Sequence, residues 1–560
     1  MSLVRNKIAG RLAAAVAPLL ESAYVDDAAR FNIELDIPKI PEHGDYATNA
    51  ALSLTRLLRR NPREIASQIV ANLKGSNEIF QKIEIAGPGF INFFIQPGVW
   101  HEVLDDVVTR SDSYGQQQLG SGKRVQVEFV SANPTGPLHI GHGRGAATGD
   151  VLAGILEACG YNVEREYYIN DAGNQMDTLG RSLYYRYQQL LGEDVEFPEG
   201  HYQGDYMVDL AREFIQEVGD RYRRMPLNEV LQDCTRFAGG RILEGIREDL
   251  ERFGISFDTW FSEQSLHDED AIRKAIEALE ARGHIYESEG AKWFRSTAFG
   301  DEKDRVVVRA NGVSTYFASD LAYHKNKFDR GYDIVVDIWG ADHHGYVERM
   351  LAGVEALGRE RSALQVILVQ LVNLLRGGKP VAMSTRAGEF VTLREVLDEV
   401  GRDAARYIFL TRRSDSPLDF DLEVAKQQSN DNPVYYVQYA HARLCSIFEV
   451  ARERGIICEW LETGRKPNLK PLALPQELAL IKLLGEYPQV LASSAQCLEP
   501  HRIPYYLDEL VSLFHSYYNK NRVLGEDPEL TQARLYLAAA VRMVIRNALR
   551  LLGVNAPEKM

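Results

Sequence analysis

The four residues His139-Ile140-Gly141-His142 constrain the fold of this chain most, because of the sequence on either side of them. Before them, residues 125–130 alternate between apolar and polar in a way that predicts a β-strand. After them, residues 145–159 show a helical pattern that ends at Gly160. A strand, a proline-containing loop and a helix in this order place both histidines at a helix N-terminus. Backbone N–H groups and the helix dipole favour phosphate there, so we predict an α/β domain with a phosphate site at this loop.

Three other interpretations of this H-x-G-H turn have to be weighed. An isolated pair of histidines can simply cap an ordinary βα loop or pack in a core. A dinucleotide-binding fingerprint fails on its register, because Thr148 stands where the third glycine or alanine is required. An adenylyltransferase would use a related turn, but the length of 560 residues argues against it.

The length and composition predict a multidomain globular protein. At 560 residues, the chain should contain about three or four domains. No uninterrupted apolar run reaches ~18 residues, so no transmembrane helix and no membrane partner are expected. Arg5 and Lys7 stand before an alanine-rich stretch, which superficially resembles a signal peptide, but Arg11 interrupts it. The apolar residues at positions 4, 8, 12, 16, 19 and 20 fall on one helical face instead, so we predict an amphipathic structural helix and a cytoplasmic protein.

The cysteines and the net charge exclude few functions. The five cysteines contain no C-x-x-C pair, which argues against a disulfide framework and a structural zinc site and predicts buried free thiols: Cys159, Cys234, Cys445, Cys458 and Cys497. The net charge of −15 neither supports nor excludes RNA binding, because an enzyme that releases its RNA product needs no large electrostatic contribution to affinity.

The chain divides into three regions by its periodicity. Residues 1–112 combine helical patterns, one of them at 61–73, with two apolar runs within 83–95 that are joined by a Gly-Pro-Gly turn. Residues 113–425 alternate strand and helix signals, which predicts a parallel sheet with crossover helices. Its strands are expected at 125–130, 163–168, 334–338 and 366–372, with a polar insertion that includes a helix at 268–282 and β-like runs at 292–295, 306–309 and 314–317. Residues 426–560 are almost wholly helical, as in a bundle.

Several of these segments resemble one known family. Residues 131–142, Ser-Ala-Asn-Pro-Thr-Gly-Pro-Leu-His-Ile-Gly-His, resemble the HIGH signature of class I aminoacyl-tRNA synthetases, and their flanks resemble the bacterial arginyl-tRNA synthetases. Residues 42–49 and 83–95 resemble the N-terminal added domain of that family. Residues 432–443 and 547–550 resemble its anticodon-binding domain, although the motif of the family begins with Asp where this chain has Asn547.

The resemblance implies a fold and a reaction. The three regions become an α+β added domain that contacts the tRNA elbow (1–112), a Rossmann-like catalytic domain with an insertion (113–425) and an all-α anticodon-binding domain (426–560). The arginine carboxylate attacks the α-phosphate of ATP, giving arginyl-adenylate and pyrophosphate. A ribose hydroxyl of the 3′-terminal adenosine of tRNA(Arg) then accepts the arginyl group. No covalent enzyme intermediate is needed, so the protein positions the reactants and stabilises charge on the phosphates. ATP with Mg²⁺ is implied, zinc is not, and a monomer is expected.

The phosphate-binding residues are predicted from two loops. His139 and His142 are expected to donate to the phosphate oxygens in the transition state, so their loss should lower the activation rate more than ATP affinity. The family's second loop, usually Lys-Met-Ser-Lys-Ser, is matched best by residues 382–386, Ala-Met-Ser-Thr-Arg, in which both lysines are missing. Lys379 and Arg386 are the candidates for the missing cation, although Lys379 also suits an exposed turn. The predicted ATP contacts are Pro134, Gly141, His142, Asp342, His343, Met383 and Ser384.

Arginine recognition calls for carboxylates, because a guanidinium binds planar, bidentate acceptors best. Glu128 and Asn133 stand five residues apart, as do a Glu and an Asn that hold arginine in the family, and Ser131 lies between them. Residues 314–323 also resemble the family. Within them Tyr316 and Asp320 share a face if a helix starts near Ala318. Asp320 would then pair with the guanidinium, although it also suits a helix N-terminal charge. Such an acidic pocket should reject neutral amino acids.

Two further segments are expected at the cleft. Residues 339–345, Trp-Gly-Ala-Asp-His-His-Gly, follow the strand at 334–338 at its carboxyl end, where ligands bind in open α/β sheets. Adjacent histidines rarely point at one ion, so Asp342 and His343 are expected to contact the adenosine of ATP or the amino acid rather than zinc. Residues 170–175 also resemble the family and are predicted to line the cleft.

Two other functions remain open at this point. A catalytically silent paralogue that binds tRNA for regulation is compatible with the missing lysines, although the predicted pocket of His139, His142, Glu128 and Asp320 disfavours it. A synthetase for another amino acid would leave the paired acidic residues without a purpose. Tyrosines beside arginines in residues 432–443 suit stacking on unpaired bases, but a tyrosine-lined bundle core would give the same pattern.

Overall fold

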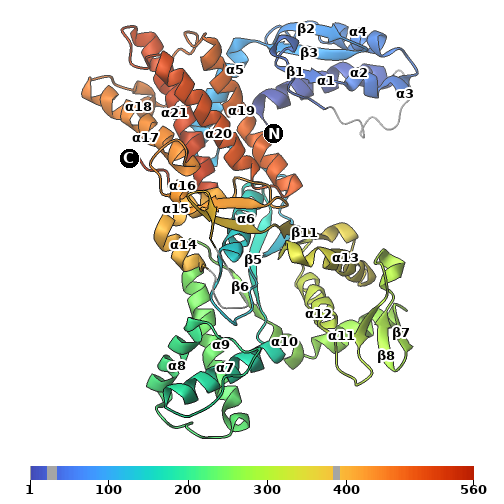
Figure 1. Ribbon diagram of the computed structural model, residues 1–560. Helices are drawn as coiled ribbons and strands as arrows, with labels where there is room; N and C mark the ends of the chain where they lie inside the picture. The colour runs from blue at the N-terminus through green and yellow to red at the C-terminus, as the bar shows by residue number, and fades with distance from the viewer. Residues whose placement is uncertain (1, 22–33, 382–390) are drawn as a thin grey trace.

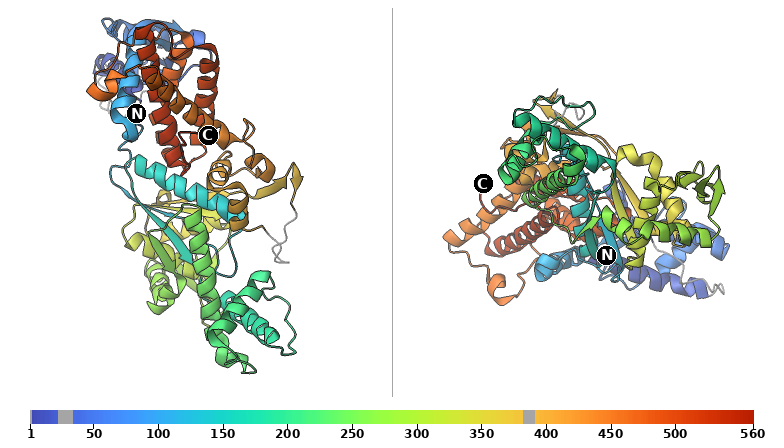
Figure 2. Two further views of the ribbon diagram at one scale, coloured as in Figure 1. Left: turned by 90° about the vertical axis from the view of Figure 1, so that its left-hand side faces the viewer. Right: turned by 90° about the horizontal axis from the view of Figure 1, so that it is seen from below.

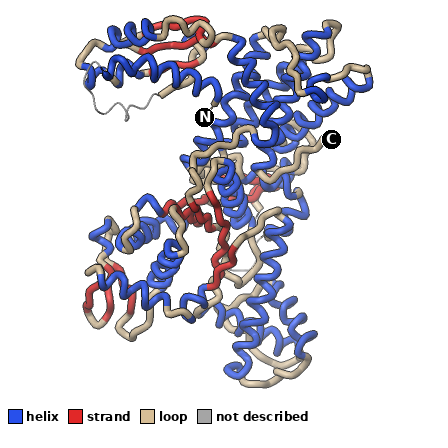
Figure 3. The backbone as a smooth tube through the Cα atoms, turned by 180° about the vertical axis from the view of Figure 1, so that it is seen from behind, coloured by secondary structure: helices blue, strands red, loops and turns tan. Residues whose placement is uncertain are grey.

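The computed structural model describes residues 2–21, 34–381 and 391–560. Figure 1 shows the N-terminal region beside the long C-terminal helices, with the central sheet below them and two groups of inserted helices at the opposite end. The side view in Figure 2 shows that the molecule is elongated along this direction. In Figure 3 the strands of the central sheet lie between the C-terminal helices and the inserted elements.

The N-terminal region packs helices on a small antiparallel sheet. Helix α1 (Leu3–Glu21) buries Val4, Ile8, Leu12, Ala15, Val16, Leu19 and Leu20, so the predicted amphipathic face is confirmed. Helix α4 (Pro62–Asn72) begins after Asn61, whose side chain accepts a hydrogen bond from the Arg63 N–H and caps the helix. The sheet order is β1-β3-β2. The remaining elements here are η2 (Pro41–His43), β1 (Tyr46–Thr48), α2 (Ala50–Ser53), α3 (Thr55–Leu58), β2 (Phe80–Ala86), β3 (Phe90–Ile95), α5 (Pro97–Arg110) and η3 (Ser111–Ser113).

The central sheet has five parallel strands in the order β11-β10-β4-β5-β6. They are β4 (Arg124–Glu128), β5 (Asn162–Ile169), β6 (Thr259–Ser262), β10 (Ile334–Gly340) and β11 (Leu364–Val369). The chain moves outward from β4 to β5 and β6, and then returns to add β10 on the other side of β4. The strand order therefore reverses between β4 and β10, which is where open α/β sheets bind ligands. The predicted class, a parallel-sheet α/β domain between an α+β region and a helical bundle, is confirmed.

Helix α6 (Ile140–Ala158) follows β4 and packs closely on the sheet. A Cβ at Gly149 would lie 2.2 Å from Cγ of Phe129, so this contact requires glycine. The helix begins at Ile140, five residues before the predicted start at residue 145, because the side chain of His139 caps it. The glycines at 141, 143 and 145 had obscured this first turn, since glycine is a weak helix former.

Two predicted strands were wrong. Residues 366–372 are not one strand: β11 ends at Val369, and β12 (Val372–Arg376) belongs to a separate sheet with the order β13-β12-β14. Residues 314–317 are not a strand, since Ser314 forms an isolated bridge and helix α12 (Tyr316–Asp329) already begins at Tyr316. Both errors arise because apolar runs continue across a change of sheet or element.

The inserted elements form two groups. The first, between β5 and β6, consists of α7 (Asn174–Leu190), α8 (Asp205–Val218) and α9 (Leu227–Arg252). The second has its own hydrophobic core around Leu279, Phe294 and Leu321, where α11 (Ala271–Ala281) and α12 pack together. Its other elements are α10 (Glu263–Asp268), β7 (Ile285–Ser288), β8 (Ala291–Phe294), η4 (Ser296–Phe299), β9 (Arg305–Val308), η5 (Ala341–Tyr346), α13 (Val347–Ala356) and η6 (Arg361–Ala363).

The C-terminal region is a bundle that also holds α5. Tyr114, just after α5, donates its hydroxyl to the Leu484 carbonyl at 2.9 Å and stacks on Tyr487, both on α19 (Pro475–Cys497). The linking and helical elements are β13 (Lys379–Pro380), α14 (Leu393–Val400), α15 (Arg402–Phe409), β14 (Leu418–Asp421), α16 (Leu422–Ala425), α17 (Pro433–Glu453), α18 (Glu459–Thr463), α20 (Arg502–Lys520) and α21 (Pro528–Leu551).

The thiols and the helix lengths complete the description. All five cysteines are free, but the expectation that they are buried was wrong for Cys497, which is exposed, and for Cys458, which is half-buried. Among the described residues, every helix is too short or too polar to cross a membrane.

Candidate active site

A cavity of about 890 Å³ opens at the carboxyl ends of β4 and β10, where the strand order reverses. Its walls come from the loop after β4, the first turns of α6, the start of α12, the element η5 and the end of β11. Ten of the predicted site residues line it: Glu128, Ser131, Asn133, His139, Gly141, His142, Tyr316, Asp320, Asp342 and His343. These residues come from distant parts of the sequence, and the sheet brings them together.

The two histidines of the signature loop are fixed by the helix that they cap. His139 Nδ1 accepts a hydrogen bond from the Gly141 N–H at 3.1 Å, and His142 Nδ1 accepts from the His139 N–H at 3.2 Å. Because Nδ1 is an acceptor in both rings, a neutral imidazole carries its hydrogen on Nε2. The rings stack with their centroids 3.7 Å apart. Each histidine therefore presents an Nε2–H donor rather than a cation.

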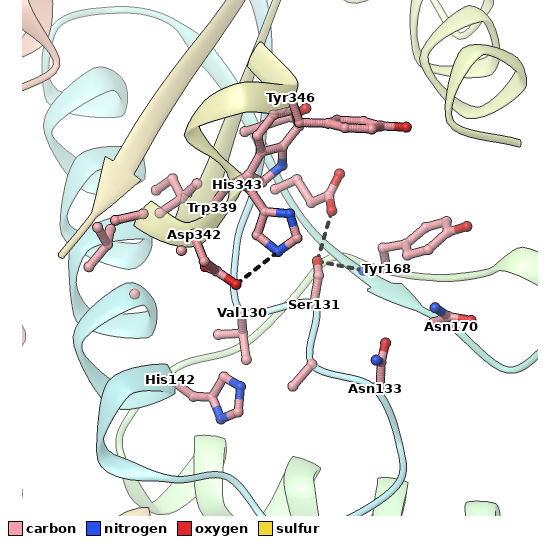
Figure 4. Close-up of a pocket in the computed structure, with 18 of the residues that line it drawn as sticks. Val130, Ser131, Asn133, His142, Tyr168, Asn170, Trp339, Asp342, His343 and Tyr346 are labelled. Carbon is pink, nitrogen blue, oxygen red and sulfur yellow. Dashed lines mark hydrogen bonds and ion pairs between the residues drawn. The ribbon is translucent and has the colours of Figure 1, made fainter. Parts of the chain in front are cut away.

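Burial keeps these rings neutral. It lowers the pKa of His142 to about 3, with the His139 ring as the second cause, and it lowers the pKa of His139 as well. Figure 4 shows His142 at the beginning of its helix, on one side of the cavity, with Asp342 and His343 on another wall. The helix N-terminus and two neutral N–H donors form a site that suits phosphate oxygens.

The loop between β4 and α6 is strained at the cavity. Val130 and Ser131 both have positive φ angles, 67° and 41°. A β-branched residue is rarely found there, and such conformations cost about 1–3 kcal/mol each. The bend lets the Ser131 hydroxyl donate to Glu128 Oε1 at 2.9 Å and accept from the Tyr168 N–H at 3.1 Å. Figure 4 shows Ser131 beside Tyr168, with the hydrogen bonds of its hydroxyl drawn as dashed lines. The strain thus orients Glu128.

Arg144 ties the two sides of the cavity together. Its side chain is fully buried in α6 and donates to three backbone carbonyls, those of Gln370 at 2.9 Å, Ser416 at 2.8 Å and Arg413 at 2.7 Å. Gln370 and Leu371, which follow β11, line the cavity together with the histidine loop. Burial lowers the pKa of Arg144 to about 10, so the guanidinium stays charged at neutral pH. The sequence pattern alone had not singled out this residue.

Asp320 is a carboxylate in the cavity wall that has no ion-pair partner among the described residues. The Tyr346 hydroxyl donates to Asp320 Oδ2. Within residues 2–21, 34–381 and 391–560, Asp320 forms no ion pair, and the nearby Lys327 ammonium pairs with Asp337 and Glu128 instead. Removal from water raises its pKa, and the tyrosine hydrogen bond acts against this. A cation entering the cavity would meet this carboxylate.

The other predicted arginine contacts have mixed surroundings. Asn133 donates from Nδ2 to Gln175 Oε1 at 2.8 Å, which joins the loop after β4 to α7. Tyr316 is the first residue of α12, so the helix starts two residues before Ala318, where the sequence analysis placed its start. Its side chain is 63% exposed. Tyr316 and Asp320 still lie one turn apart at the cavity.

The second-loop predictions fall largely outside the described residues. Ala382, Met383, Ser384, Thr385 and Arg386 lie in the segment 382–390, which the structure does not describe. Lys379 is exposed in β13 and, like the buried Pro134, is not among the residues that line the cavity.

The segment 339–345 forms the end of β10 and the 3₁₀ helix η5. His343 Nε2 lies 3.7 Å from Asp342 Oδ2, and both side chains are exposed at the cavity. In the described part of the chain, no three His, Cys, Asp or Glu side chains come together in a way that could hold a metal ion.

Two buried carboxylates were missed from the sequence, Asp337 in the cavity wall and Glu263 near it. Glu263, the first residue of α10, is 5% exposed, and burial raises its pKa to about 7, with Asp320 and Asp171 adding to the rise. Asp337 is fully buried in β10, beside Glu128 in the strand register. A charged residue within the apolar run 334–338 was the available signal for Asp337. Glu263 gave no such signal, because it follows a strand, β6, that the periodicity had not revealed.

Two tyrosines of the C-terminal bundle lie at the border between its core and its surface. Tyr435 and Tyr439 stack with an interplanar angle of 6°, and Arg443 lies 4.6 Å from the centroid of the Tyr439 ring. Both tyrosines are half-buried. Asn547 is buried and donates from Nδ2 to the Ser111 carbonyl at 2.8 Å. It therefore joins α21 to η3.

The chain is similar over nearly its whole length to curated proteins. It is 59% identical over 529 residues to the arginine–tRNA ligase of Geobacter sp. (strain M21), with 94% of this chain and 95% of that protein covered. It is 49% identical over 557 residues to that of Desulforamulus reducens, with 100% and 99% covered. Among solved structures, the Thermus thermophilus arginyl-tRNA synthetase superposes with a TM-score of 0.77 at 21% identity, covering 99% of this chain and 100% of that one, and supports the fold.

Family models match three successive parts of the chain. They are the arginyl tRNA synthetase N terminal domain at 4–95, the class I (R) tRNA synthetase catalytic domain at 103–429 and the DALR anticodon binding domain at 437–560. The chain has a cleft at the switch point of a parallel sheet, and two histidines that cap a helix line this cleft. Together with the family matches, these features define a class I aminoacyl-tRNA synthetase. Within this class, the two curated relatives named above are both arginine–tRNA ligases. The chain belongs to the arginyl-tRNA synthetase family.

Proposed function

We propose that this chain acts as an arginine–tRNA ligase and that Asp320 recognises the side chain of the substrate arginine. It activates arginine with ATP and transfers it to the 3′-terminal adenosine of tRNA(Arg). The observation that carries the assignment of the pocket is Asp320, a carboxylate in the cavity wall without an ion pair among the described residues. A guanidinium supplies the charge and the paired donors that this carboxylate lacks.

The arginine contacts follow from the positions around Asp320. Tyr316, one turn before it on α12, is placed to pack against the substrate side chain. Glu128, Ser131 and Asn133 line the adjoining wall after β4 and would hold the rest of the amino acid, including its α-amino group. The carboxylate of arginine would then face the signature loop, where the α-phosphate of ATP has to be.

The ATP side is assigned to the histidine loop. The Nε2–H groups of His139 and His142 would donate to phosphate oxygens, and charge that builds in the transition state strengthens these bonds. Gly141 leaves room for the His139 ring, since a Cβ at position 141 would lie 2.9 Å from that ring. Asp342 and His343 in the cavity wall, with Met383 and Ser384 of the undescribed segment, are the other proposed ATP contacts. Pro134 is buried beside the cavity and would shape the loop rather than line the site. Lys379 and Arg386 remain the proposed cations for the pyrophosphate.

Magnesium enters this proposal as part of the substrate. ATP arrives with Mg²⁺ on its phosphates, so a protein cage for the ion is unnecessary. We assign no zinc to the chain. The metal would neutralise phosphate charge while the neutral histidines donate hydrogen bonds.

The tRNA contacts are assigned by region. We propose residues 1–112 as the domain at the tRNA elbow, 113–425 as the catalytic domain and 426–560 as the anticodon-binding domain. The half-buried tyrosines of α17 beside Arg443 support base stacking in the last of these. A monomer in the cytoplasm is the proposed state, and five free thiols are consistent with a reducing compartment.

ATP–pyrophosphate exchange tests the proposal directly. The purified protein is assayed with each amino acid in turn, with and without total tRNA. Exchange with arginine, and with no other amino acid, is expected, and a requirement for tRNA would show that RNA assembles the site. Folded protein that binds tRNA but exchanges no amino acid would refute the assignment and favour the silent paralogue.

A further inference from the structure

Two carboxylates and one lysine form a closed ionic group behind the arginine pocket. Glu128 and Asp337 are neighbours in the parallel register of β4 and β10. The Lys327 ammonium, from α12, donates to Glu128 Oε2 at 2.5 Å and to Asp337 Oδ1 at 2.8 Å. The Lys327 side chain is completely buried and lies over the Tyr323 ring at 4.4 Å. No role in the reaction has so far been given to Lys327.

The remaining oxygens of both carboxylates are also occupied. Glu128 Oε1 accepts from Ser131. Asp337 Oδ2 faces His324 Nε2 at 2.8 Å, while His324 Nδ1 faces the Asp320 carbonyl at 2.8 Å. Both ring nitrogens of His324 therefore face oxygen atoms of neighbouring residues.

The carboxylates around Lys327 outnumber the lysine that pairs with them. Glu128 and Asp337 both pair with the Lys327 ammonium. Asp320, the third carboxylate, forms no ion pair among the described residues, so it is left to face the guanidinium of a substrate arginine. Without Lys327 the buried carboxylates would lose their shared cation, and buried carboxylates avoid this by taking up a proton.

We propose that Lys327 is a positioning residue for arginine recognition: by pairing with Glu128 and Asp337, it holds Glu128 ionised and directed at the pocket and leaves Asp320 as the carboxylate for the guanidinium. The inference rests on the proposed function, because it concerns how the same pocket matches an arginine. It adds a residue that the substrate does not need to touch.

Glu128 is the member of the group closest to losing its charge. Burial raises its pKa, and Lys327 is the largest influence that lowers it. For Asp337 burial is outweighed by Lys327 and His324, and the pKa is lowered. The carboxylates raise the pKa of Lys327 to about 12 in spite of its burial, so it stays charged. Removing Lys327 should therefore protonate Glu128 first.

Other charged groups face this cluster from each neighbouring element. They are Asp320, Tyr323 and His324 on α12, Asp337 on β10, and Glu166 and Tyr168 on β5. Glu166 is compensated by Arg330, which pairs with it at 2.5 Å, and by the Tyr323 hydroxyl. These groups stay in place when Lys327 is changed, so they do not create a new dependence on pH by themselves.

The test compares Lys327→Met with a matched control, Lys325→Met. Lys325 lies on the same helix, is 33% exposed and pairs with Asp329. Arginine-dependent exchange is measured between pH 6.5 and 9 in the presence of tRNA, and KM for arginine, KM for ATP and kcat are separated. Lys327→Arg, which keeps the charge, and Lys327→Met combined with Glu128→Gln complete the set.

We expect Lys327→Met to raise KM for arginine at pH 6.5 by about tenfold or more, the effect of one lost charge-assisted hydrogen bond. The increase should shrink as pH rises and Glu128 regains its charge, while KM for ATP changes by less than about twofold. Lys327→Arg should restore part of the affinity. In the Glu128→Gln background the added pH dependence should disappear. Lys325→Met should match the wild type.

Three results would overturn the inference. One is a KM ratio between Lys327→Met and wild type that is the same at every pH. Another is a loss of thermal stability with unchanged KM for arginine, which would make the group purely structural. The third is an added pH dependence that persists in the Glu128→Gln background. If Lys327→Met does not fold, the pH series is run on Lys327→Met combined with Asp337→Asn, which removes one of the two facing charges and keeps an acceptor for His324. A wild type that exchanges with no amino acid would instead refute the proposed function.

Discussion

Replacement of Asp320 by asparagine is the most direct test of how the pocket recognises arginine. Asp320→Asn keeps the size of the side chain and an oxygen that can accept from Tyr346, but it removes the charge. The expected loss is specific to a cationic substrate. In the proposed arrangement ATP binds at the histidine loop rather than at Asp320, so its KM should change little.

The magnitude follows from the electrostatics of the site. Two unit charges about 4 Å apart attract by about 4 kcal/mol at an effective dielectric of about 20. The asparagine oxygen retains one acceptor, and the cavity is open to water, so the net loss should be about 2–4 kcal/mol. At about 1.4 kcal/mol for each factor of ten, kcat/KM for arginine should fall by about 30-fold to about 1,000-fold. Most of the change should appear in KM, because the guanidinium is remote from the reacting phosphate.

The assay is ATP–pyrophosphate exchange with tRNA present, using arginine and its neutral analogue citrulline. The ratio of kcat/KM for arginine to that for citrulline should decrease in Asp320→Asn, since the variant no longer gains from a positive charge. Asp329→Asn, on the same helix but exposed and paired with Lys325, is the matched control and should behave as wild type. A loss of less than about threefold for arginine, or an equal loss in Asp329→Asn, would refute the role of Asp320.

Three further changes test other parts of the cavity. His142→Asn keeps a short cap acceptor but removes the Nε2–H donor, so kcat for activation should fall by about 100-fold with little change in KM for ATP, as single-turnover kinetics would measure. Burial raises the pKa of Glu263 from 4.5 to about 7, so the folded protein gains this negative charge beside Asp320 only above about pH 7. KM for arginine should therefore fall as pH rises through 7, and Glu263→Gln should flatten that change. The folded state holds this proton where the unfolded chain has lost it, so the contribution of Glu263 to stability should decrease as pH rises from 4.5 to about 7. Arg144→Met leaves three carbonyls without donors, so hydrogen exchange near Gln370 and Ser416 should accelerate, while exchange in the N-terminal sheet stays constant.

The local part of the site could be predicted from the sequence, because its geometry is set by neighbours along the chain. The histidine loop lies between a strand and a helix that periodicity reveals, and capping then fixes both rings. The start of α6 was predicted too late for the same local reason, since its first turn is rich in glycine. The boundary at Val369 was missed because the apolar pattern continues while Gln370 turns away to pair with the backbone of Ser414.

The ionic group around Lys327 could not be predicted in this way. Glu128 and Lys327 are 199 residues apart, and their contact depends on the register that aligns β4 with β10. Nothing local to Lys327 distinguishes it from Lys325, two residues earlier, which lies at the surface. Only the direction of α12 over the sheet decides which lysine is buried. Asp337 was visible as a charge within an apolar strand, but its partner was not.

In the proposed arrangement one strand, β4, positions groups for both substrates. Its last residue, Glu128, belongs to the ionic group at the proposed arginine site, and the loop that follows it leads to the histidines of the proposed phosphate site. The strand order reverses beside β4, and α12 and η5 flank β10 on the other side of this point. Arg144 joins α6 to the segment after β11, and Lys327 joins α12 to β4 and β10. The distance between the two proposed sites should therefore be set by the single loop between β4 and α6, which is held at one end by the ionic group and at the other by the cap of α6.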